Sequence, residues 1–471
     1  MKNNSVEVVM LCMALCWSVS SAESRSEVKD AKAPPNVLFI AVDDLNDYPT
    51  YAERYPDAIT PNLDRLAKQG VVFEKAYCQW PTCGPSRNSV MSGLLPTTVA
   101  GKEKWVDEDL QKRTRELGTK LVHEYFSEHG YTTLAVGKLC HDHVPEGSVD
   151  ESGGRGSFTA GLGRMCKNYG PAGTSTDWFA VDKPDEEFPD YEAASWAINQ
   201  LQKEQKNPFM LMVGFIRPHV PWYVNKKWFD LYDPAELTLP PYKADDLDDV
   251  PPASVAVNIH KNMPRTQWAI ENNQWRNILH AYLASVSFMD HQLGRILDAL
   301  EASPYKDNTV IVLWSDHGYH MGEKNSFQKH SLWDRAGHVP LLFAGTGIEK
   351  EKRCGRVVSL LDIYPTLLEL CGLPENPKNE GRSLVPLLND PKREWPYPAL
   401  TAWRENCFAL QAERYRYMRY KDGSEELYDH QNDPNEWTNL AENPEFTTVK
   451  VELQAQLDAL EIKGEVTRWG K

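Results

Sequence analysis

The chain has 471 residues, of which 41% are hydrophobic and 25% charged, a composition typical of a globular protein with a sizeable core. Its formal net charge of -16 excludes a protein that binds nucleic acid through an overall positive charge, and no basic stripe is present. No stretch beyond the N-terminal region is long and apolar enough for a transmembrane helix, so we expect no membrane insertion.

The N-terminus predicts a secretory signal peptide over residues 1–22. Lys2 precedes an apolar run over residues 8–17, and small residues then lead to a cleavage point after Ala22. We therefore expect export to the periplasm or the extracellular space. The mature chain contains no Asn-x-Ser/Thr acceptor, which favours a bacterial source. Its seven remaining cysteines show no framework spacing, so any disulfide pairing stays open.

Apolar, β-rich runs alternate with helical patterns along the chain. The runs predict buried strands at residues 36–42, 71–77, 132–136, 209–215, 309–314 and 339–343. The helical patterns lie at residues 61–70, 117–129, 191–205 and 274–302. This alternation predicts an α/β fold in which helices flank a large, mostly parallel sheet.

The other segments suggest loops and a second, smaller unit. Residues 147–173 are rich in glycine and residues 233–264 in proline and aspartate, so both predict loops, and residues 374–398 predict a linker with six prolines. Short strands at residues 399–410, 415–421 and 426–428, with a closing helix at 445–462, predict a small antiparallel sheet. We expect a large domain over residues 33–380 and a C-terminal subdomain over residues 381–471.

Carboxylates follow two of the predicted strands. Asp43 and Asp44 come directly after the first strand, and Asp316, His317 and a glycine follow the strand at residues 309–314. Ligands in α/β proteins bind at the carboxyl ends of strands, and paired carboxylates there suit a hard cation. An isolated Asp-Asp pair is better explained by a helix cap beside a solvated loop acid.

The stretch Cys83-Gly84-Pro85-Ser86-Arg87 begins a predicted helix. Cys83 has no Cys-x-x-Cys partner, so neither a zinc knuckle nor a redox pair is indicated. A helix start offers free N–H groups and a positive field, and Arg87 adds a planar donor for sulfate or phosphate. The alternative is a buried thiol beside a helix cap.

Basic residues follow other predicted strands. Lys138 and His141 belong to a Gly-Lys-x-x-His sequence after residue 136, and His219 lies in Arg-Pro-His-Val-Pro after residue 215. The prolines fix the backbone around His219, which suits a preorganised side chain. Lys329 lies 13 residues after Asp316. The alternative is that Lys138 and Lys329 are solvated lysines and His141 a loop residue.

Taken in this order, the motifs resemble those of the type I sulfatases, within the alkaline-phosphatase superfamily. The Gly-Lys-x-x-His and Arg-Pro-His-x-Pro sequences resemble its iduronate-2-sulfatase-like branch. The resemblance implies an alkaline-phosphatase-like fold and hydrolysis of sulfate esters. It also implies that Cys83 is converted after translation into formylglycine, whose hydrate is the nucleophile, by a formylglycine-generating or equivalent maturation enzyme.

The same resemblance assigns the site residues. It implies one calcium ion held by Asp43, Asp44, the modified Cys83, Asp316 and His317. It implies catalytic contacts from Cys83, Arg87, Lys138, His141, His219 and Lys329. In this assignment the lysines hold sulfate oxygens, His141 contacts the nucleophile and His219 assists the leaving oxygen.

The substrate class rests on weaker signals. The chain has 15 tryptophans, several of them in or near predicted loops, and aromatic faces stack on sugar rings, which favours a sulfated carbohydrate substrate. Two other functions stay open. A phosphomonoesterase or phosphonate hydrolase of the same superfamily could use the same metal and formylglycine, and a glycan-binding protein could retain the fold without catalysis.

Overall fold

The computed structural model describes Met1 and residues 33–99, 107–163, 165, 168–170, 174–404, 406–460 and 462. The signal peptide expected over residues 1–22 lies, Met1 aside, outside these ranges. Residues from Pro34 onward form one compact unit. Within the described ranges, no helix combines the length and the apolar character needed to cross a bilayer.

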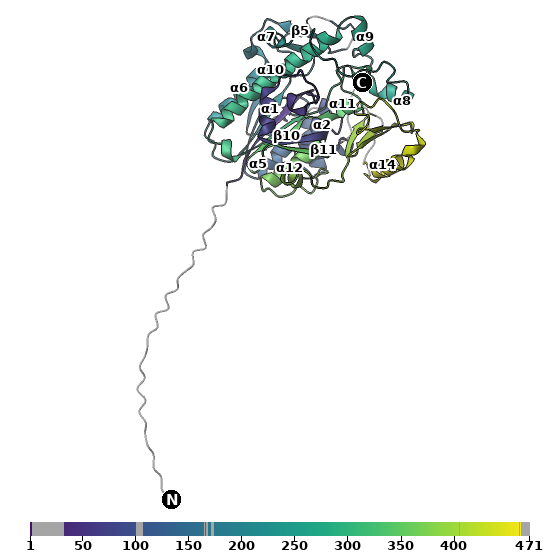
Figure 1. The fold of residues 1–471 in the computed structure, drawn as a ribbon. Helices are drawn as coiled ribbons and strands as arrows, with labels where there is room; N and C mark the ends of the chain where they lie inside the picture. The colour runs from purple at the N-terminus through teal and green to yellow at the C-terminus, as the bar shows by residue number, and fades with distance from the viewer. Residues whose placement is uncertain are drawn as a thin grey trace. The chain divides into compact units, whose positions relative to one another are not determined.

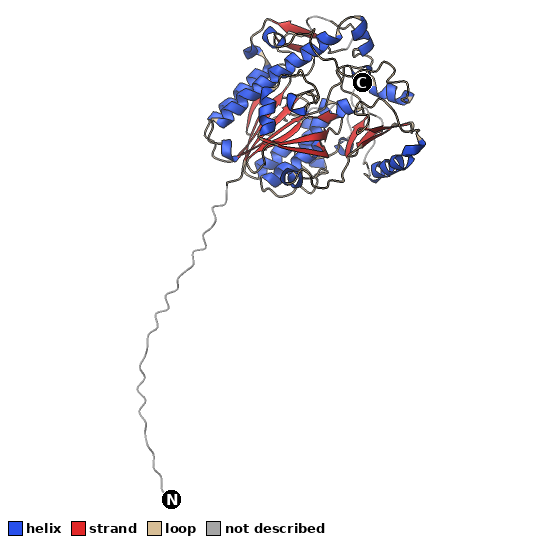
Figure 2. Cartoon of the chain, in the orientation of Figure 1, coloured by secondary structure: helices blue, strands red, loops and turns tan. Residues whose placement is uncertain are grey.

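The described residues form a nine-stranded mixed sheet at the centre of this unit (Figures 1 and 2). The strand order is β11-β2-β10-β8-β1-β6-β3-β4, and β9 pairs with β2. The strands are β1 (Asn36–Val42), β2 (Gly70–Tyr77), β3 (Thr132–Gly137), β4 (Glu151–Gly154), β6 (Phe209–Phe215), β8 (Thr309–Ser315), β9 (His338–Val339), β10 (Leu341–Gly345) and β11 (Lys352–Ser359).

The central strand β1 pairs in parallel with both β6 and β8. All residues of these three strands are buried, which explains why their sequences are continuously apolar. Strand β10 runs antiparallel to β8 and β2, while β3 and β11 keep the parallel direction of their neighbours β6 and β2. The predicted α/β class with a mostly parallel sheet is confirmed.

Helices cover both faces of the sheet (Figure 1). On one face, Leu38 and Ile40 of β1 share a hydrophobic cluster with α1 (Pro61–Lys68), α6 (Pro189–Gln202) and α10 (Trp275–Glu301). On the other face, the alternate residues of β1 pack with α2 (Cys83–Ser92), α5 (Val122–Glu128) and α12 (Ile363–Leu370). The remaining helices are α3 (Pro96–Val99), α4 (Asp107–Glu116), α7 (Lys226–Phe229), α8 (Pro252–Asn258), α9 (Thr266–Glu271), α11 (Asp334–Gly337), α13 (Val385–Asn389) and α14 (Thr447–Ala459).

Two smaller sheets complete the fold. A parallel pair joins β5 (Trp178–Val181) to β7 (Trp222–Asn225). Near the C-terminus, an antiparallel sheet contains β12 (Ala399–Trp403), β13 (Cys407–Gln411), β14 (Tyr415–Arg419) and β15 (Glu425–Asp429). Its apolar residues and those of α14 form a cluster with Trp80, Leu332 and Trp333. The predicted C-terminal antiparallel sheet with a closing helix is confirmed.

Several predicted elements differ in detail. The strand expected at residues 339–343 is divided at Pro340, which has no N–H for the ladder, into β9 and β10. The strand expected at residues 399–410 is a hairpin, because Arg404 and Asn406 adopt positive φ angles and reverse the chain. The three segments predicted as loops or linker contain β4, α8 and α13. The six described cysteines are all buried free thiols.

Candidate active site

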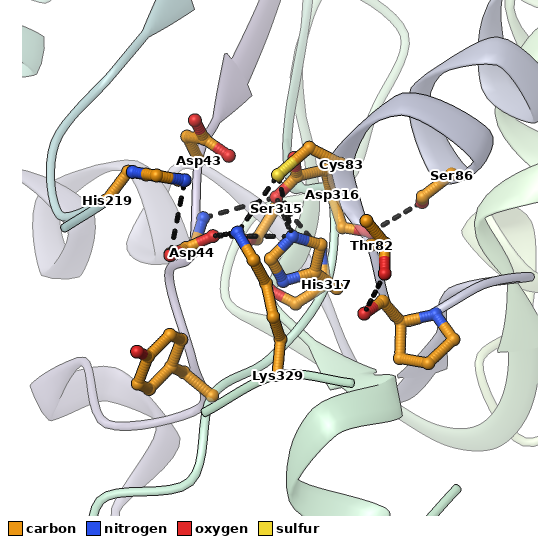
Figure 3. A network of polar contacts seen from close by, with 12 residues as sticks. Asp43, Asp44, Thr82, Cys83, Ser86, His219, Ser315, Asp316, His317 and Lys329 are labelled. Carbon is orange, nitrogen blue, oxygen red and sulfur yellow. Dashed lines mark hydrogen bonds and ion pairs between the residues drawn. The ribbon is translucent and has the colours of Figure 1, made fainter. Parts of the chain in front are cut away.

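The acidic residues follow two neighbouring strands, β1 and β8, and lie together at the carboxyl edge of the sheet. Val42 and Ser315 are paired at the carboxyl ends of β1 and β8, so Asp43, Asp44, Asp316 and His317 leave the sheet side by side. Helix α2 begins at Cys83 beside them (Figure 3). Ligand atoms of Asp43, Cys83, Asp316 and His317 all lie within 4.8 Å of one another, as do those of Asp43, Asp44, Cys83 and His219.

The acidic residues present unsatisfied oxygen atoms. Asp43 Oδ1 and Asp44 Oδ2 are buried and have no hydrogen-bond partner among the described residues, although buried carboxylates are normally fully paired. Asp44 adopts a φ of 62°, and its backbone N–H donates to Asp316 Oδ1 at 3.2 Å. This backbone turn places both carboxylates at the strand end.

His317 is oriented to use its second nitrogen. Its Nδ1 donates to the Gly318 carbonyl at 3.0 Å, which leaves Nε2 as an acceptor. Nε2 lies 3.2 Å from Cys83 Sγ and 3.3 Å from Asp44 Oδ1. Two carboxylate oxygens that lack a hydrogen-bond partner among the described residues, with an imidazole nitrogen beside Cys83 and Asp44, fit a divalent cation, and the oxygen-rich set suits calcium.

Three buried cations balance the acids. Lys138 Nζ lies 2.5 Å from Asp43 Oδ2, Lys329 Nζ lies 2.6 Å from Asp44 Oδ1, and Arg87 Nε donates to Asp316 Oδ2 at 2.8 Å. Burial opposes the charged form of both lysines, but the adjacent carboxylates outweigh it, so both pKa values are raised. Lys138 and Lys329 are only 2% and 6% exposed, so neither is the solvated surface lysine considered as the alternative.

The Cys83 thiol is held in its neutral form. Burial raises its pKa to about 12, with Asp43 adding to the effect and Lys138 and Lys329 opposing it. Lys329 Nζ donates to its sulfur at 3.0 Å. Because the thiolate is the reactive form of cysteine, an unmodified Cys83 is a poor nucleophile in this environment.

The pKa values of the two carboxyl groups at the end of β1 shift in opposite directions. Burial raises the pKa of Asp44 to about 7, with the charges of Asp43 and Asp316 acting in the same direction and Lys329 against them. Burial also opposes ionisation of Asp43, yet Lys138 and the neighbouring basic groups hold its pKa well below the ordinary value. A divalent cation would favour the ionised form of both carboxyl groups.

His219 reaches the site from the loop after β6. Its Nδ1 donates to the Val220 carbonyl at 2.5 Å, and its Nε2 lies 3.9 Å from Asp44 Oδ2. Burial and the Lys329 charge hold its pKa well below the usual value, so the ring is neutral. Arg217 is structural here, because it is buried and donates to the His219 carbonyl at 3.2 Å.

His141 lies beside the first residues of α2. It is exposed, and a Cβ atom added to Gly84 would meet its Cδ2 at 3.0 Å, so the ring lies against the start of α2. Although the side chain keeps contact with solvent, the protein around the ring partly desolvates it, and this desolvation and the charge of Lys138 lower its pKa. The structure thus gathers all the predicted site residues around the start of α2.

Phe158 is a residue at the site that the sequence did not indicate. Its ring lies 4.6 Å from that of His219, edge to face, and Lys138 Nζ lies 5.2 Å from its centre. It belongs to the glycine-rich segment predicted as a loop, where a single aromatic residue carries no recognisable signal.

The mixed sheet, with acidic side chains that could hold a metal ion and basic side chains at the carboxyl ends of its strands, defines a hydrolase of the alkaline-phosphatase-like fold. The sulfatase family profile matches residues 35–373, and a profile for the C-terminal part of N-sulphoglucosamine sulphohydrolase matches residues 322–463. The chain belongs to the sulfatase family, as the motifs predicted, and is a sulfuric ester hydrolase.

Individual relatives agree with this assignment. A sulfatase from Formosa agariphila is 43% identical over 95% of this chain and 91% of its own length. Human iduronate 2-sulfatase is 29% identical over 78% of this chain and 74% of its own. The crystal structure of a putative sulfatase from Bacteroides thetaiotaomicron has a TM-score of 0.71 at 25% identity, covering 90% of this chain and 92% of that one.

Proposed function

We propose that this sulfatase removes sulfate from a sulfated carbohydrate, using a formylglycine formed from Cys83 and one bound calcium ion. The observation that carries the proposal is the state of Cys83: a neutral thiol at a helix start, in contact with Lys329 and close to two carboxylate oxygens that have no hydrogen-bond partner among the described residues. A cysteine serving as a thiolate nucleophile needs a lowered pKa, and this environment raises it.

The substrate class is supported by the similarity to human iduronate 2-sulfatase, whose name specifies a sulfated sugar acid. It is also supported by the half-buried Phe158, which offers an aromatic face beside His219. Aromatic rings next to the leaving group of an ester suit a pyranose ring better than a small flexible alcohol.

The charges of the site suit an anionic substrate. Arg87, Lys138 and Lys329 offset the charges of three carboxylates, so a bound divalent cation would leave the site positive. When present, calcium supplies Lewis acidity and formylglycine supplies the hydroxyl of a hydrated aldehyde as nucleophile. The remaining ammonium protons of Lys138 and Lys329 can then donate to sulfate oxygens, which is preorganised electrostatic stabilisation.

His219 and His141 can transfer protons on opposite sides of the ester. Because Nδ1 of His219 is committed to the Val220 carbonyl, this ring exchanges a proton only at Nε2. An anionic substrate favours protonation there, and that proton is available to the departing alcohol oxygen. His141 is neutral beside the start of α2 and can accept a proton from the nucleophile.

We further propose the organisation of the chain around this activity. A signal peptide over residues 1–22 directs export, and a formylglycine-generating or equivalent enzyme of the host modifies Cys83. Residues 33–380 form the catalytic domain and residues 381–471 the C-terminal subdomain. The sequence signals for these assignments are the apolar N-terminal run and the proline-rich stretch before β12.

The proposal is tested on protein produced in a host that makes formylglycine. Peptide mass spectrometry should find formylglycine at position 83, and the protein should release sulfate from 4-nitrophenyl sulfate and from members of a sulfated oligosaccharide panel. Chelation should abolish activity and calcium should restore it. Cys83→Ala protein is the matched inactive control. Active protein with an intact thiol at Cys83, or faster turnover of 4-nitrophenyl phosphate than of the sulfate, contradicts the proposal.

A further inference from the structure

We propose that Asp107, which belongs to none of the sequence motifs, positions His141 for proton transfer with the nucleophile. The inference deepens the proposed function and rests on it, because it concerns how the protein holds one of the two histidines of that site. Asp107 is the first residue of α4 and is only 7% exposed. Its carboxylate faces residues 140–143, which we call the His141 turn.

The place of the His141 ring depends on its backbone. The ring lies against Gly84 at the start of α2, directly after the nucleophile position. The side chain is nevertheless exposed to solvent, so packing surrounds it only in part. Whatever fixes the backbone of the His141 turn therefore fixes the distance between the imidazole and residue 83.

Asp107 binds the two residues that follow His141. The backbone N–H of His143 donates to Asp107 Oδ2 at 2.8 Å, and that of Asp142 donates to Oδ1 at 3.5 Å. One carboxylate thus holds two successive peptide groups of the turn. The charge of Asp107 also favours the protonated form of His141, although desolvation and Lys138 outweigh it and lower the pKa of the ring.

The His143 ring holds the far end of the same turn. Its Nδ1 donates to the Gly137 carbonyl at 2.6 Å, and its Nε2 lies 2.8 Å from Ser152 Oγ. Both nitrogens of this ring therefore have structural partners. The Cys140 N–H donates to the His143 carbonyl at 2.5 Å and closes the turn. The contact with Asp107 joins this closed turn to α4.

An exposed ion pair on the turn is the weaker contact. Arg155 Nη1 lies 2.5 Å from Asp142 Oδ1, and the two side chains are 32% and 56% exposed. Exposed pairs of this kind contribute little, because water screens them. Asp107 is buried, so its loss should shift His141 more, and a displacement of about 1 Å near reacting atoms can cost about 10²-fold in rate.

The test is a double-mutant cycle with 4-nitrophenyl sulfate, run on enzyme whose Cys83 has been converted to formylglycine (the converted enzyme). We expect Asp107→Ala to lower kcat about 10- to 100-fold and to change KM less than about twofold, because the groups that bind sulfate stay in place. His141→Ala should lower kcat about 10²-fold or more. In the His141→Ala background, Asp107→Ala should have no further effect on kcat, since no imidazole remains to be positioned.

Two further variants separate positioning from loss of stability. Asp107→Asn keeps one acceptor oxygen for the His143 N–H and should recover part of the lost kcat. Asp290→Ala is the matched control, because Asp290 on α10 is also buried and accepts from the backbone N–H groups of Asn62 and Leu63 at 3.1 and 2.7 Å. It joins α10 to α1, so its loss should lower stability and leave kcat unchanged well below the unfolding temperature.

The cycle overturns the inference if the losses from Asp107→Ala and His141→Ala are additive, or if either single variant keeps the wild-type kcat. Mass spectrometry must show equal conversion of Cys83 in all proteins. If Asp107→Ala does not fold, the same cycle with Asp107→Asn decides between the same outcomes. Failure of the proposed function is distinct, because wild-type protein with formylglycine at position 83 would then release no sulfate from 4-nitrophenyl sulfate.

Discussion

Lys329 shows how a single buried charge organises this site. Its ammonium group contacts both Asp44 and Cys83, so it acts on a carboxylate and on the nucleophile position at once. We expect Lys329→Met to lower kcat/KM for 4-nitrophenyl sulfate about 10²- to 10³-fold, because a preorganised donor to the sulfate oxygens is lost. Steady-state kinetics of the converted enzyme measure this.

The control for that experiment is Lys352→Met, which removes an exposed lysine paired with Glu349 and should leave the kinetics unchanged. Mass spectrometry of both proteins must show equal conversion of Cys83, since a maturation defect would also lower activity. A Lys329→Met enzyme with equal conversion and a loss of less than threefold would show that Lys329 does not contact the sulfate.

At the residue scale, motif order predicted much of the candidate site. Asp43, Cys83 and Asp316 could be grouped from sequence because each lies directly at a strand end or a helix start, and such positions meet at one edge of a sheet. The contact of Phe158 with His219 could not be predicted, because it depends on how an irregular segment folds back over the sheet.

Helix α11 shows how a short element depends on ionic contacts. Arg335 on this helix donates to both carboxylate oxygens of Asp47 at 2.9 and 2.8 Å, and both residues are buried. Asp47→Asn leaves a buried arginine without its main partner, so we expect the free energy of unfolding to fall by about 3–5 kcal/mol at pH 7. Urea unfolding followed by tryptophan fluorescence measures the change.

The same variant should show a characteristic pH dependence. Burial raises the pKa of Asp47, but Arg335, Arg54 and His338 outweigh it, so the folded-state pKa lies below 3.8. A carboxyl group with a lowered pKa stabilises the fold above its unfolded-state pKa and loses this effect as pH falls through the folded-state value. The difference between wild type and Asp47→Asn should therefore shrink below about pH 4. Asp458→Asn, at an exposed ion pair with Arg419, should stay within about 0.5 kcal/mol of wild type at pH 7.

At the element scale, the buried parallel strands were the most predictable part of the fold. Strands β1 and β6 begin and end at the predicted residues, because complete burial requires an uninterrupted apolar sequence. The sequence did not predict strand β11, which lies at the edge of the sheet. Its sequence, KRCGRVVS, begins with two charged residues and lacks a continuous apolar run. An edge strand buries only part of its surface, so its composition resembles that of a loop.

At the scale of the whole molecule, the two predicted domains share one hydrophobic cluster. Trp80 and Trp333 of the larger part pack with Trp403, Tyr417 and Tyr428 of the C-terminal sheet. Trp333 Nε1 also donates to Glu426 Oε2 at 2.9 Å. We expect residues 33–380 alone to aggregate or to unfold without cooperativity, because cutting there exposes these aromatic side chains to water.

Differential scanning calorimetry and gel filtration test whether residues 33–380 need the C-terminal part for stable folding. The shortened protein is compared with mature protein covering residues 23–471. Coexpression of residues 381–471 as a separate chain should restore solubility if the shared cluster is the cause. A soluble monomer of residues 33–380 with a sharp unfolding transition would show instead that the larger part is self-sufficient.

The path of the chain between β8 and β10 has a consequence for how this enzyme can diversify. The backbone leaves the sheet after Ser315, supplies His317 and Lys329, and returns antiparallel beside its own departure point. Both ends of this excursion are held by the same strand ladder, and Tyr319, Met321 and Phe327 in its middle are buried in the core. Insertions or deletions near residues 319–328 should thus disrupt the core and displace Lys329, so variation in what the enzyme accepts should come from other loops.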